Sequence, residues 1–335
     1  MSKTIVLGIE STAHTFGVGI VDDSDDFILA DERAQYIPPK GGIHPREASR
    51  YLAEKAPDVL ERAIKAANIS PRDIAAIAVA LGPGLGPCLR VGATIARALA
   101  TYLSKPLVPV NHAVAHIEIG LKITGAKDPV IVYLSGGNTA VLAFVEGRYR
   151  VFGETLDIAL GNLLDTFARE VGLGPPYVVQ GMHVVDRCAE KGRKIIDLPY
   201  VVRGQDVAFS GLLTAALRAV RKGIDIHDVC LTLREIAYNS IIEIAARCLA
   251  QTKKREIMDV GGVAASPILR EKLEKMAQIY SVNLFVVPPR YAVDNGVMIA
   301  WTGLLAFKAG VTIDVEKALV RQRWRVDEVD IVWRR

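Results

Sequence analysis

Two stretches of this chain repeat the same order of strands and turns, and this repetition constrains the fold more than any other feature. Residues 4–21 (TIVLGIESTAHTFGVGIV) and 130–147 (VIVYLSGGNTAVLAFVEG) each have the pattern of a β-hairpin with small or hydroxyl residues at its tip. A third strand and a helical pattern follow each hairpin. Such a repeat predicts two related halves built from one supersecondary unit.

Paired halves of this kind are typical of the actin/sugar-kinase/Hsp70-like ATPase (ASKHA) architecture, in which backbone N–H groups at the hairpin tips approach nucleotide phosphates. We therefore predict a two-domain α/β fold of this type, with duplicated βββαβαβα halves. The predicted boundaries are 1–110 for the N-terminal half and 111–310 for the C-terminal half, which includes a histidine-bearing helix and an insertion. A tail, 311–335, is expected to pack back on the N-terminal half.

The chain has 335 residues and is 50% apolar, which is enough to bury two cores. Its net charge of +4 permits a polyanionic partner without requiring one. Basic clusters near residues 191–194, 218–222 and 253–255 fit solvated helix or loop surfaces. The arginines of RQRWR (321–325) fit either an edge-packed tail or a segment that contacts RNA.

Four scattered cysteines without a C-x-x-C pair argue against a zinc ribbon and against a secreted disulfide scaffold. The first ten residues (MSKTIVLGIE) have the pattern of a strand and not of a signal peptide. No apolar run approaches the roughly 20 residues that span a bilayer. The expected location is the cytoplasm, with no membrane partner.

The segment NHAVAHIEIG (111–120) is the candidate reactive site. Asn111 is suited to cap a helix that carries His112 and His116 on one face, because side chains four apart are neighbours on a helix. Two imidazoles so placed can bind one metal ion. The alternative is a pair of hydrogen-bonded histidines on a half-buried helix.

A glycine- and proline-rich loop, LGPGLGP (81–87), joins a buried strand (74–81) to a helix. Free N–H groups at a helix start can bind an anion. The loop matches neither of the common nucleotide-binding glycine motifs. A tight turn packed against the other domain is the alternative.

Several motifs, taken together, resemble one family. They are GIESTAHTFGVGIV, GGIHPREA, GPGLGPCLRVGATIARALA, VNHAVAHIEIG, VYLSGGNTAV, DIALGNLLDTFAREVGLG, FSGLLTAA and DNGVMIAW. In order and spacing they resemble the archaeal/eukaryotic catalytic subunit of the KEOPS complex, related to bacterial TsaD. This is the tRNA N6-threonylcarbamoyladenosine synthase family, formerly labelled O-sialoglycoprotein endopeptidase.

The resemblance implies an acyltransferase that acts on tRNA. A threonylcarbamoyl-adenylate, made by another enzyme, would bind in an interdomain cleft. The threonylcarbamoyl group would move to N6 of the adenosine 3′ of the anticodon in tRNAs reading ANN codons, and AMP would leave. Implied partners are tRNA and the other KEOPS subunits: a small RIO-like kinase, a dimerising subunit and a helical bridging subunit.

The resemblance also implies the metal ligands, which are His112, His116, Tyr133 and Asp294. Two imidazoles, a phenolate and a carboxylate suit Fe, with Zn as the alternative, and disfavour Mg. In this reading the two histidines and Asp294 act in catalysis through one metal ion per subunit. Without the resemblance, the alternative for Tyr133 is a tyrosine in the protein core, and the alternative for Asp294 is a helix N-cap.

Other residues are implied to bind the substrate or a nucleotide (ATP, AMP or the adenylate). They are Tyr133, Leu134, Ser135, Gly136, Gly137, Asp165, Gly181, Asp186 and Ser266. The segment 174–192 is longer than the family pattern, and Asp186 takes its acidic position, with Gly181 or Met182 at its last glycine. Ser266 stands where the family has asparagine. Without the resemblance, Asp165 would be interpreted as a solvated carboxylate on an amphipathic helix.

Three alternatives remain, of which one is a non-catalytic scaffold that only binds ATP in a complex and the other two are rival activities. A metallopeptidase of the H-E-x-x-H class needs a glutamate beside its first histidine, but this chain has Ala113 there, and Glu118 falls outside the motif. An ATP-driven kinase or chaperone of the same fold usually carries an aspartate at the first hairpin, where this chain has Glu10-Ser11-Thr12.

Overall fold

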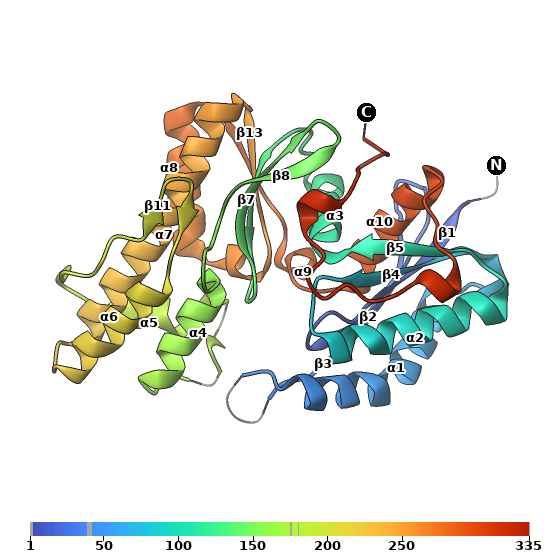
Figure 1. Ribbon diagram of the computed structural model, residues 1–335, viewed down its shortest axis with the longest axis horizontal. Helices are drawn as coiled ribbons and strands as arrows, with labels where there is room; N and C mark the ends of the chain where they lie inside the picture. The colour runs from blue at the N-terminus through green and yellow to red at the C-terminus, as the bar shows by residue number, and fades with distance from the viewer. Residues whose placement is uncertain (1–2, 39–41, 175, 180, 335) are drawn as a thin grey trace. The chain divides into compact units, whose positions relative to one another are not determined.

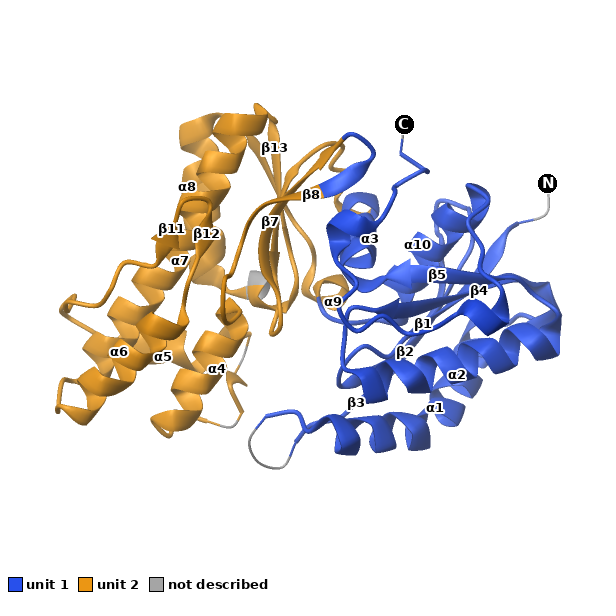
Figure 2. Cartoon of the chain, in the orientation of Figure 1, with its two compact units in different colours: residues 1–122, 146–149, 293–335 blue, residues 123–145, 150–292 orange. Residues whose placement is uncertain are grey.

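The computed structural model describes residues 3–38, 42–174, 176–179 and 181–334 (Figure 1). Its contacts divide the chain into two compact units (Figure 2). Unit 1 comprises residues 1–122, 146–149 and 293–335, and unit 2 comprises 123–145 and 150–292. The histidine-bearing helix up to Lys122 and residues 293–310 thus belong to unit 1, whereas the predicted C-terminal half ran from 111 to 310. The boundaries of the predicted halves come from the sequence repeat and not from contacts, and they stay a prediction.

Unit 1 is built on a five-stranded mixed sheet in the order β3-β2-β1-β4-β5. β1 pairs antiparallel with β2, and β2 with β3, whereas β4 is parallel to both β1 and β5. The strands are β1 (Ile5–Glu10), β2 (Thr15–Val21), β3 (Ile28–Gln35), β4 (Ile74–Gly82) and β5 (Leu107–Asn111). β4 is almost completely buried, as its unbroken apolar sequence predicts.

Helices cover both faces of this sheet. α1 (Pro45–Ala67) and α2 (Gly86–Leu103) share a core with the side chains of Leu7 and Ile9 on one face. α10 (Gly296–Lys308) packs on the other face, where a Cβ atom on Gly8 would come within 2.1 Å of the Ala300 backbone nitrogen. Glycine in the sheet therefore permits α10 to approach the β1 backbone closely.

Unit 2 repeats this sheet, with the order β14-β13-β6-β7-β8. β6 and β7 form an antiparallel hairpin, and β13 is parallel to β6 and β14. The strands are β6 (Val130–Leu134), β7 (Thr139–Val145), β8 (Arg148–Glu154, of which the first two residues are assigned to unit 1), β13 (Glu256–Val260) and β14 (Asn283–Val286). The strand order is that of unit 1, with the hairpin and third strand on one side and two parallel strands on the other. This confirms the predicted duplicated α/β architecture.

Most helices of unit 2 share a core with Val130, Val132 and Leu134 on one face of this sheet, and α7 is the longest of these helices (Figure 1). The helices are α4 (Leu160–Glu170), α5 (Val184–Ala189), α6 (Ser210–Arg221), α7 (Ile226–Thr252), α8 (Pro267–Tyr280) and α9 (Pro289–Ala292). Two short hairpins pair β9 (Val178–Val179) with β10 (Met182–His183), and β11 (Val202–Arg203) with β12 (Asp206–Val207). In the part of the chain that the structure describes, 3₁₀ turns lie at Gly262–Ala265 in unit 2 and at Pro71–Asp73, Val315–Lys317 and Val326–Glu328 in unit 1.

Two of the four cysteines form a disulfide, Cys188–Cys230, while Cys88 and Cys248 are free and buried. Their sequence spacing did not predict this pair, because the two residues meet only through the packing of α5 against α7. Across the described helices, none is both long enough and apolar enough to cross a bilayer.

Candidate functional site

α3 (His112–Thr124) begins directly after β5, and Asn111 fixes its start. The Asn111 Oδ1 accepts hydrogen bonds from the backbone N–H groups of Ala113 (3.0 Å) and Val114 (3.2 Å). Its Nδ2 donates to the Trp324 carbonyl at 3.0 Å. The predicted cap is therefore confirmed, and it also ties the first turn of α3 to the C-terminal segment.

His112 and His116 lie one turn apart on α3, with ring centroids 4.7 Å apart and ring planes nearly perpendicular. Both are buried. The Asp294 Oδ1 lies 3.6 Å from His112 Nε2 and 3.4 Å from His116 Nε2. One potential ligand atom from each residue falls within 4.8 Å of the other two, so the three could share a metal ion.

Asp294 takes its position from the start of α10. The residue that caps this helix is Asn295, whose Oδ1 accepts from the Met298 N–H at 2.9 Å. The alternative role of Asp294 as the cap is therefore wrong, and its carboxylate is left to face the histidines. Arg33 Nη1 donates to the Asp294 carbonyl at 3.3 Å, which holds the backbone as well.

Glu10, at the end of β1, orients His112. Its Oε2 lies 2.9 Å from His112 Nδ1, and its Oε1 accepts from the Thr12 N–H at 2.6 Å and from the Thr12 hydroxyl at 2.5 Å. With Nδ1–H donated to Glu10, the Nε2 atom of His112 faces His116 and Asp294. Carboxylates commonly fix metal-binding histidines in this way. The sequence interpretation missed this role, for which the only signal was a glutamate at the hairpin tip.

The charges in this group favour a cation. Burial lowers the pKa of His112, but the carboxylates of Glu10 and Asp294 outweigh it and raise that pKa to about 9. Burial lowers the pKa of His116, which therefore stays neutral. Burial opposes ionisation of Asp294, yet the charge of His112 and the hydrogen bond from His116 hold the pKa of this carboxyl well below its usual range.

This donor set fits the implied metal. Two imidazole nitrogens and one carboxylate oxygen are ligands that suit Fe or Zn, and three ligands leave coordination positions open. Tyr133 lies at the end of β6, in unit 2, with its ring buried, and Asn138 Nδ2 lies 3.4 Å from its hydroxyl. Its predicted role as a fourth ligand stays a prediction.

The tip of the unit 2 hairpin is the turn 135–138. The Ser135 N–H donates to the Asn138 carbonyl at 2.9 Å, and the Ser135 Oγ accepts from the Asn138 N–H at 3.0 Å. A Cβ atom on Gly136 or Gly137 would meet no described atom within 4 Å. One side of the turn is therefore open for a ligand to approach the backbone. The side chain of Leu134, by contrast, belongs to the core of unit 2.

The start of α4 supports this tip. A Cβ atom on Gly161 would lie 2.8 Å from both the Gly136 Cα and the Ser135 carbonyl oxygen. The Leu160 N–H donates to the Thr139 hydroxyl at 2.8 Å. Only a glycine at position 161 lets α4 approach the turn so closely.

Asp165, on α4, pairs with His183. The Oδ1 of Asp165 lies 3.1 Å from His183 Nε2, while His183 Nδ1 accepts from the Val185 N–H at 3.1 Å and caps α5. Because Nδ1 accepts, the neutral ring carries its proton on Nε2 and donates it to Asp165. Asp165 is thus a paired carboxylate and not a purely solvated one. Its contact with a ligand stays a prediction, and His183 was missed because only the fold brings it to α4.

Asp186 and Ser266, 80 positions apart, meet inside unit 2. The Asp186 carboxylate is fully buried and accepts from the hydroxyls of Ser266 and Tyr238, each at 3.0 Å. Burial outweighs these hydrogen bonds and raises the pKa of Asp186. Gly181 lies in the turn between β9 and β10 at φ +77°, a conformation that favours glycine. The nucleotide-binding roles of these three predicted residues stay predictions.

The loop 82–86 is a packed turn. The Leu85 N–H donates to the Thr12 carbonyl at 2.7 Å, and the Gly84 N–H donates to the Gln322 carbonyl at 3.2 Å. These groups are therefore not available to bind an anion. The loop packs against the first hairpin tip and the C-terminal segment of its own unit.

The C-terminal segment is held by contacts with the rest of unit 1, such as the hydrogen bond of 2.7 Å from the Arg321 N–H to the Leu81 carbonyl, and by contacts within itself. Arg321 forms an ion pair with Glu328, and its guanidinium carbon lies 4.7 Å from the centroid of the Trp324 ring. Arg325 pairs with Asp327. These contacts agree with the packed-tail alternative for RQRWR.

Two observations bear on the rival activities. Glu118 is buried and accepts a hydrogen bond from the Tyr149 hydroxyl at 2.6 Å, so it is not placed to act as a general base. Glu10 is engaged by His112 and Thr12, whereas a carboxylate that positions Mg or water would need free oxygen atoms. Neither rival gains support.

Comparison with known proteins gives consistent matches. Residues 28–301 match the family model described as TsaD: tRNA N6-adenosine threonylcarbamoyltransferase. A protein of that name from Hyperthermus butylicus is 61% identical over 98% of this chain and 92% of its own length. A protein of the same name from Metallosphaera sedula is also 61% identical, over 98% of this chain and 99% of its own length.

Solved structures of distant sequence share the fold. HypF from T. kodakarensis superposes with a TM-score of 0.64 at 15% identity, over 96% of this chain and 49% of HypF. Component A of (R)-2-hydroxyglutaryl-CoA dehydratase from Acidaminococcus fermentans superposes with a TM-score of 0.53 at 14% identity, over 94% and 99% of the two chains.

Proposed function

Since this chain belongs to the tRNA N6-adenosine threonylcarbamoyltransferase family, we propose that it performs this transfer with a metal ion held by His112, His116 and Asp294. The reaction moves the threonylcarbamoyl group from threonylcarbamoyl-AMP to N6 of the adenosine 3′ of the anticodon in tRNAs reading ANN codons. The acceptor is an exocyclic amine, which is a weak nucleophile, so the donor carbonyl has to be positioned and activated.

The grouping of His112, His116 and Asp294 carries this proposal. A bound Fe or Zn ion would supply Lewis-acid polarisation of the donor carbonyl. Each histidine offers its Nε2 atom and Asp294 offers a carboxylate oxygen. Glu10 keeps the His112 ring turned with Nε2 toward the other two ligands. Tyr133 is the proposed fourth ligand.

Unit 2 would bind the nucleotide portion of the donor. The backbone of Leu134–Gly137 would meet the phosphate or carbamoyl group, because one side of that turn is open. Asp165, held by His183, is placed on a partly exposed surface, where its second oxygen could accept from a ribose hydroxyl. Gly181, Asp186 and Ser266 would complete this side. We propose AMP, ATP or the adenylate as the occupant.

The tRNA substrate follows from the family. The proposed protein partners are the other KEOPS subunits, namely the small RIO-like kinase, the dimerising subunit and the helical bridging subunit. The proposed place of action is the cytoplasm, where tRNA is modified.

Reconstitution tests the proposal. The full chain is supplied with labelled threonine, bicarbonate, ATP, the adenylate-forming enzyme, an ANN-decoding tRNA and the proposed partners, and the modified nucleoside is measured by mass spectrometry. His116→Ala and Asp294→Ala should each abolish product and lower bound metal while circular dichroism stays unchanged. His44→Ala is the matched control, because His44 is exposed and its side chain makes no cap hydrogen bond.

Wild-type product formation by either ligand variant would contradict the metal assignment. No product from the wild-type protein in a mixture that works with an established member of the family would contradict the activity itself.

A further inference from the structure

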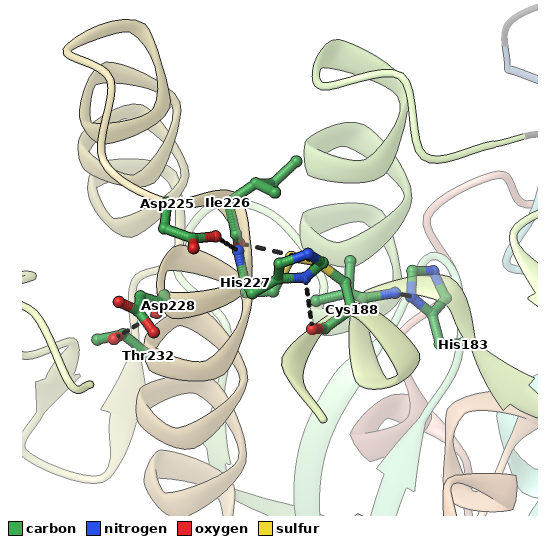
Figure 3. The surroundings of a disulfide bond; sticks show 9 residues. His183, Cys188, Asp225, Ile226, His227, Asp228 and Thr232 are labelled. Carbon is green, nitrogen blue, oxygen red and sulfur yellow. Dashed lines mark hydrogen bonds between the residues drawn. A yellow bond between two sulfur atoms is a disulfide. The ribbon is translucent and has the colours of Figure 1, made fainter. Parts of the chain in front are cut away.

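The Cys188–Cys230 disulfide links α5 to the first turns of α7 (Figure 3). The two Cα atoms are 5.9 Å apart, within the range of about 4.4–6.8 Å that a disulfide needs. Cys188 is 7% exposed and Cys230 is completely buried. The bond therefore lies inside unit 2, out of reach of most surface chemistry.

The helix that carries Cys188 is very short. α5 has six residues, and a helix of this length has little stability of its own. It nevertheless presents two of the polar groups described above. His183 caps its start and reaches Asp165 on α4, while Asp186, in its first turn, reaches Ser266 at the start of α8. The placement of both contacts depends on what holds α5.

α7 provides the support. The Asp186 carboxylate accepts from Tyr238, two turns along α7 from Cys230. At the other end of α5, the Cys188 carbonyl accepts from His227 Nδ1 at 3.1 Å, next to the disulfide (Figure 3). The disulfide is the covalent member of this set. A hydrogen bond can be replaced by one to water, whereas the covalent disulfide cannot.

We propose that the Cys188–Cys230 disulfide is a positioning cross-link for the nucleotide side of the site. By tying α5 to α7 it keeps Asp186 at Ser266 and His183 at Asp165. This inference rests on the proposed function in taking these polar groups as part of nucleotide binding. A dithiol reductant would break the cross-link by thiol–disulfide exchange: Cys188 and Cys230 each become a thiol, and the reductant becomes a cyclic disulfide.

The bond itself is tested first by counting thiols. The full chain is denatured and labelled with N-ethylmaleimide, with or without prior reduction, and then weighed by mass spectrometry. We expect two N-ethylmaleimide labels per chain without reduction, on Cys88 and Cys248, and four labels after reduction. Four labels without reduction, in protein purified without reductant, would overturn the inference.

Nucleotide affinity tests the positioning role, with AMP as the probe in isothermal titration calorimetry. The Cys188→Ala/Cys230→Ala variant should bind AMP at least fivefold more weakly than the oxidised wild type. Wild type reduced with dithiothreitol until the thiol count reaches four labels should show the same loss and recover after reoxidation, which keeps the test valid if the variant folds poorly. Cys248→Ala is the matched control, since it removes a buried free thiol from the same helix. It should change affinity less than twofold.

A double-mutant cycle separates positioning from general stability. Asp186→Asn should weaken AMP binding in the oxidised protein, and adding the cysteine substitutions should then cause less than a further twofold loss. A variant without the disulfide that binds AMP like the wild type would overturn the inference. So would a combined variant whose loss of AMP affinity equals the product of the losses from Asp186→Asn and from the cysteine substitutions. Bound metal at His112 and His116 should not change. Absence of modified nucleoside with AMP binding intact would count against the proposed function alone.

Discussion

Glu10 and His112 are 102 positions apart in the chain, yet the Glu10 carboxylate lies 2.9 Å from His112 Nδ1. Both side chains are buried, and Thr12 occupies the other Glu10 oxygen. The end of the first strand therefore supports the start of the histidine-bearing helix. This relationship makes Glu10 part of the proposed metal centre without making it a ligand.

We predict that Glu10→Gln lowers metal affinity by about 10- to 100-fold, because loss of a carboxylate behind a metal-binding histidine weakens both its orientation and its basicity. Competition with a chelator, read by elemental analysis, measures the change. Glu32→Gln is the control, since Glu32 pairs with Arg62 at the surface. Unchanged affinity in the Glu10 variant would remove Glu10 from the centre.

We predict that Asp259→Val stabilises the protein. Asp259 is fully buried in β13, and neither carboxylate oxygen has a hydrogen-bond partner among the described residues. Its neighbours in the sheet are Val132 and Val286. An unsatisfied buried polar group costs about 1–3 kcal/mol, so valine should raise the free energy of unfolding by an amount of this order, measured by chemical denaturation.

The gain from Asp259→Val should depend on pH. Burial raises the pKa of Asp259 well above its usual value, so the folded protein binds this proton more tightly than the unfolded chain does. Stability of the wild type should therefore fall as pH rises from about 4 through the folded pKa, and the advantage of the variant should be larger at pH 8 than at pH 4. Glu256→Val, in the same strand, should instead destabilise, because Glu256 accepts from the N–H groups of Lys127 and Asp128. An equal gain at both pH values would contradict the buried-charge explanation.

We predict that Gly161→Ala weakens AMP binding by displacing the turn around Gly136. The added methyl group would lie 2.8 Å from the Gly136 Cα and the Ser135 carbonyl oxygen, both of which are backbone atoms. Gly211→Ala is a close control, because Gly211 is also the second residue of a helix and its Cβ would meet no described atom within 4 Å. The control should gain about 0.5–1 kcal/mol of stability with unchanged affinity. Equal affinities in the two variants would show that the turn tolerates the shift.

We predict that Cys188→Ala/Cys230→Ala lowers the free energy of unfolding by about 4 kcal/mol, because the disulfide closes a 42-residue loop and restricts the unfolded chain. Urea denaturation without reductant measures this loss. The same experiment on the wild type with reductant should give a similar value. A loss below about 1 kcal/mol would mean that the unfolded chain gains little freedom when the bond is cut.

Local pattern in the sequence determined the elements of the fold. The repeated hairpins predicted two related sheets, and the observed strand orders match. Asn111 and the four-residue spacing of His112 and His116 predicted a capped helix with both imidazoles on one face, because capping and helical periodicity act over a few residues. The order of motifs along the chain pointed to the family and to Asp294, although nothing in the local pattern around Asp294 required a ligand.

Only the tertiary structure decided which distant side chains share an environment. It placed Glu10 behind His112, His183 beside Asp165, Asp186 against Ser266, and Cys188 against Cys230. It also left the Asp259 carboxyl buried without a partner among the described residues. These relationships join positions far apart in the chain, and their energies depend on distance, burial and neighbouring charge, none of which is encoded in sequence spacing.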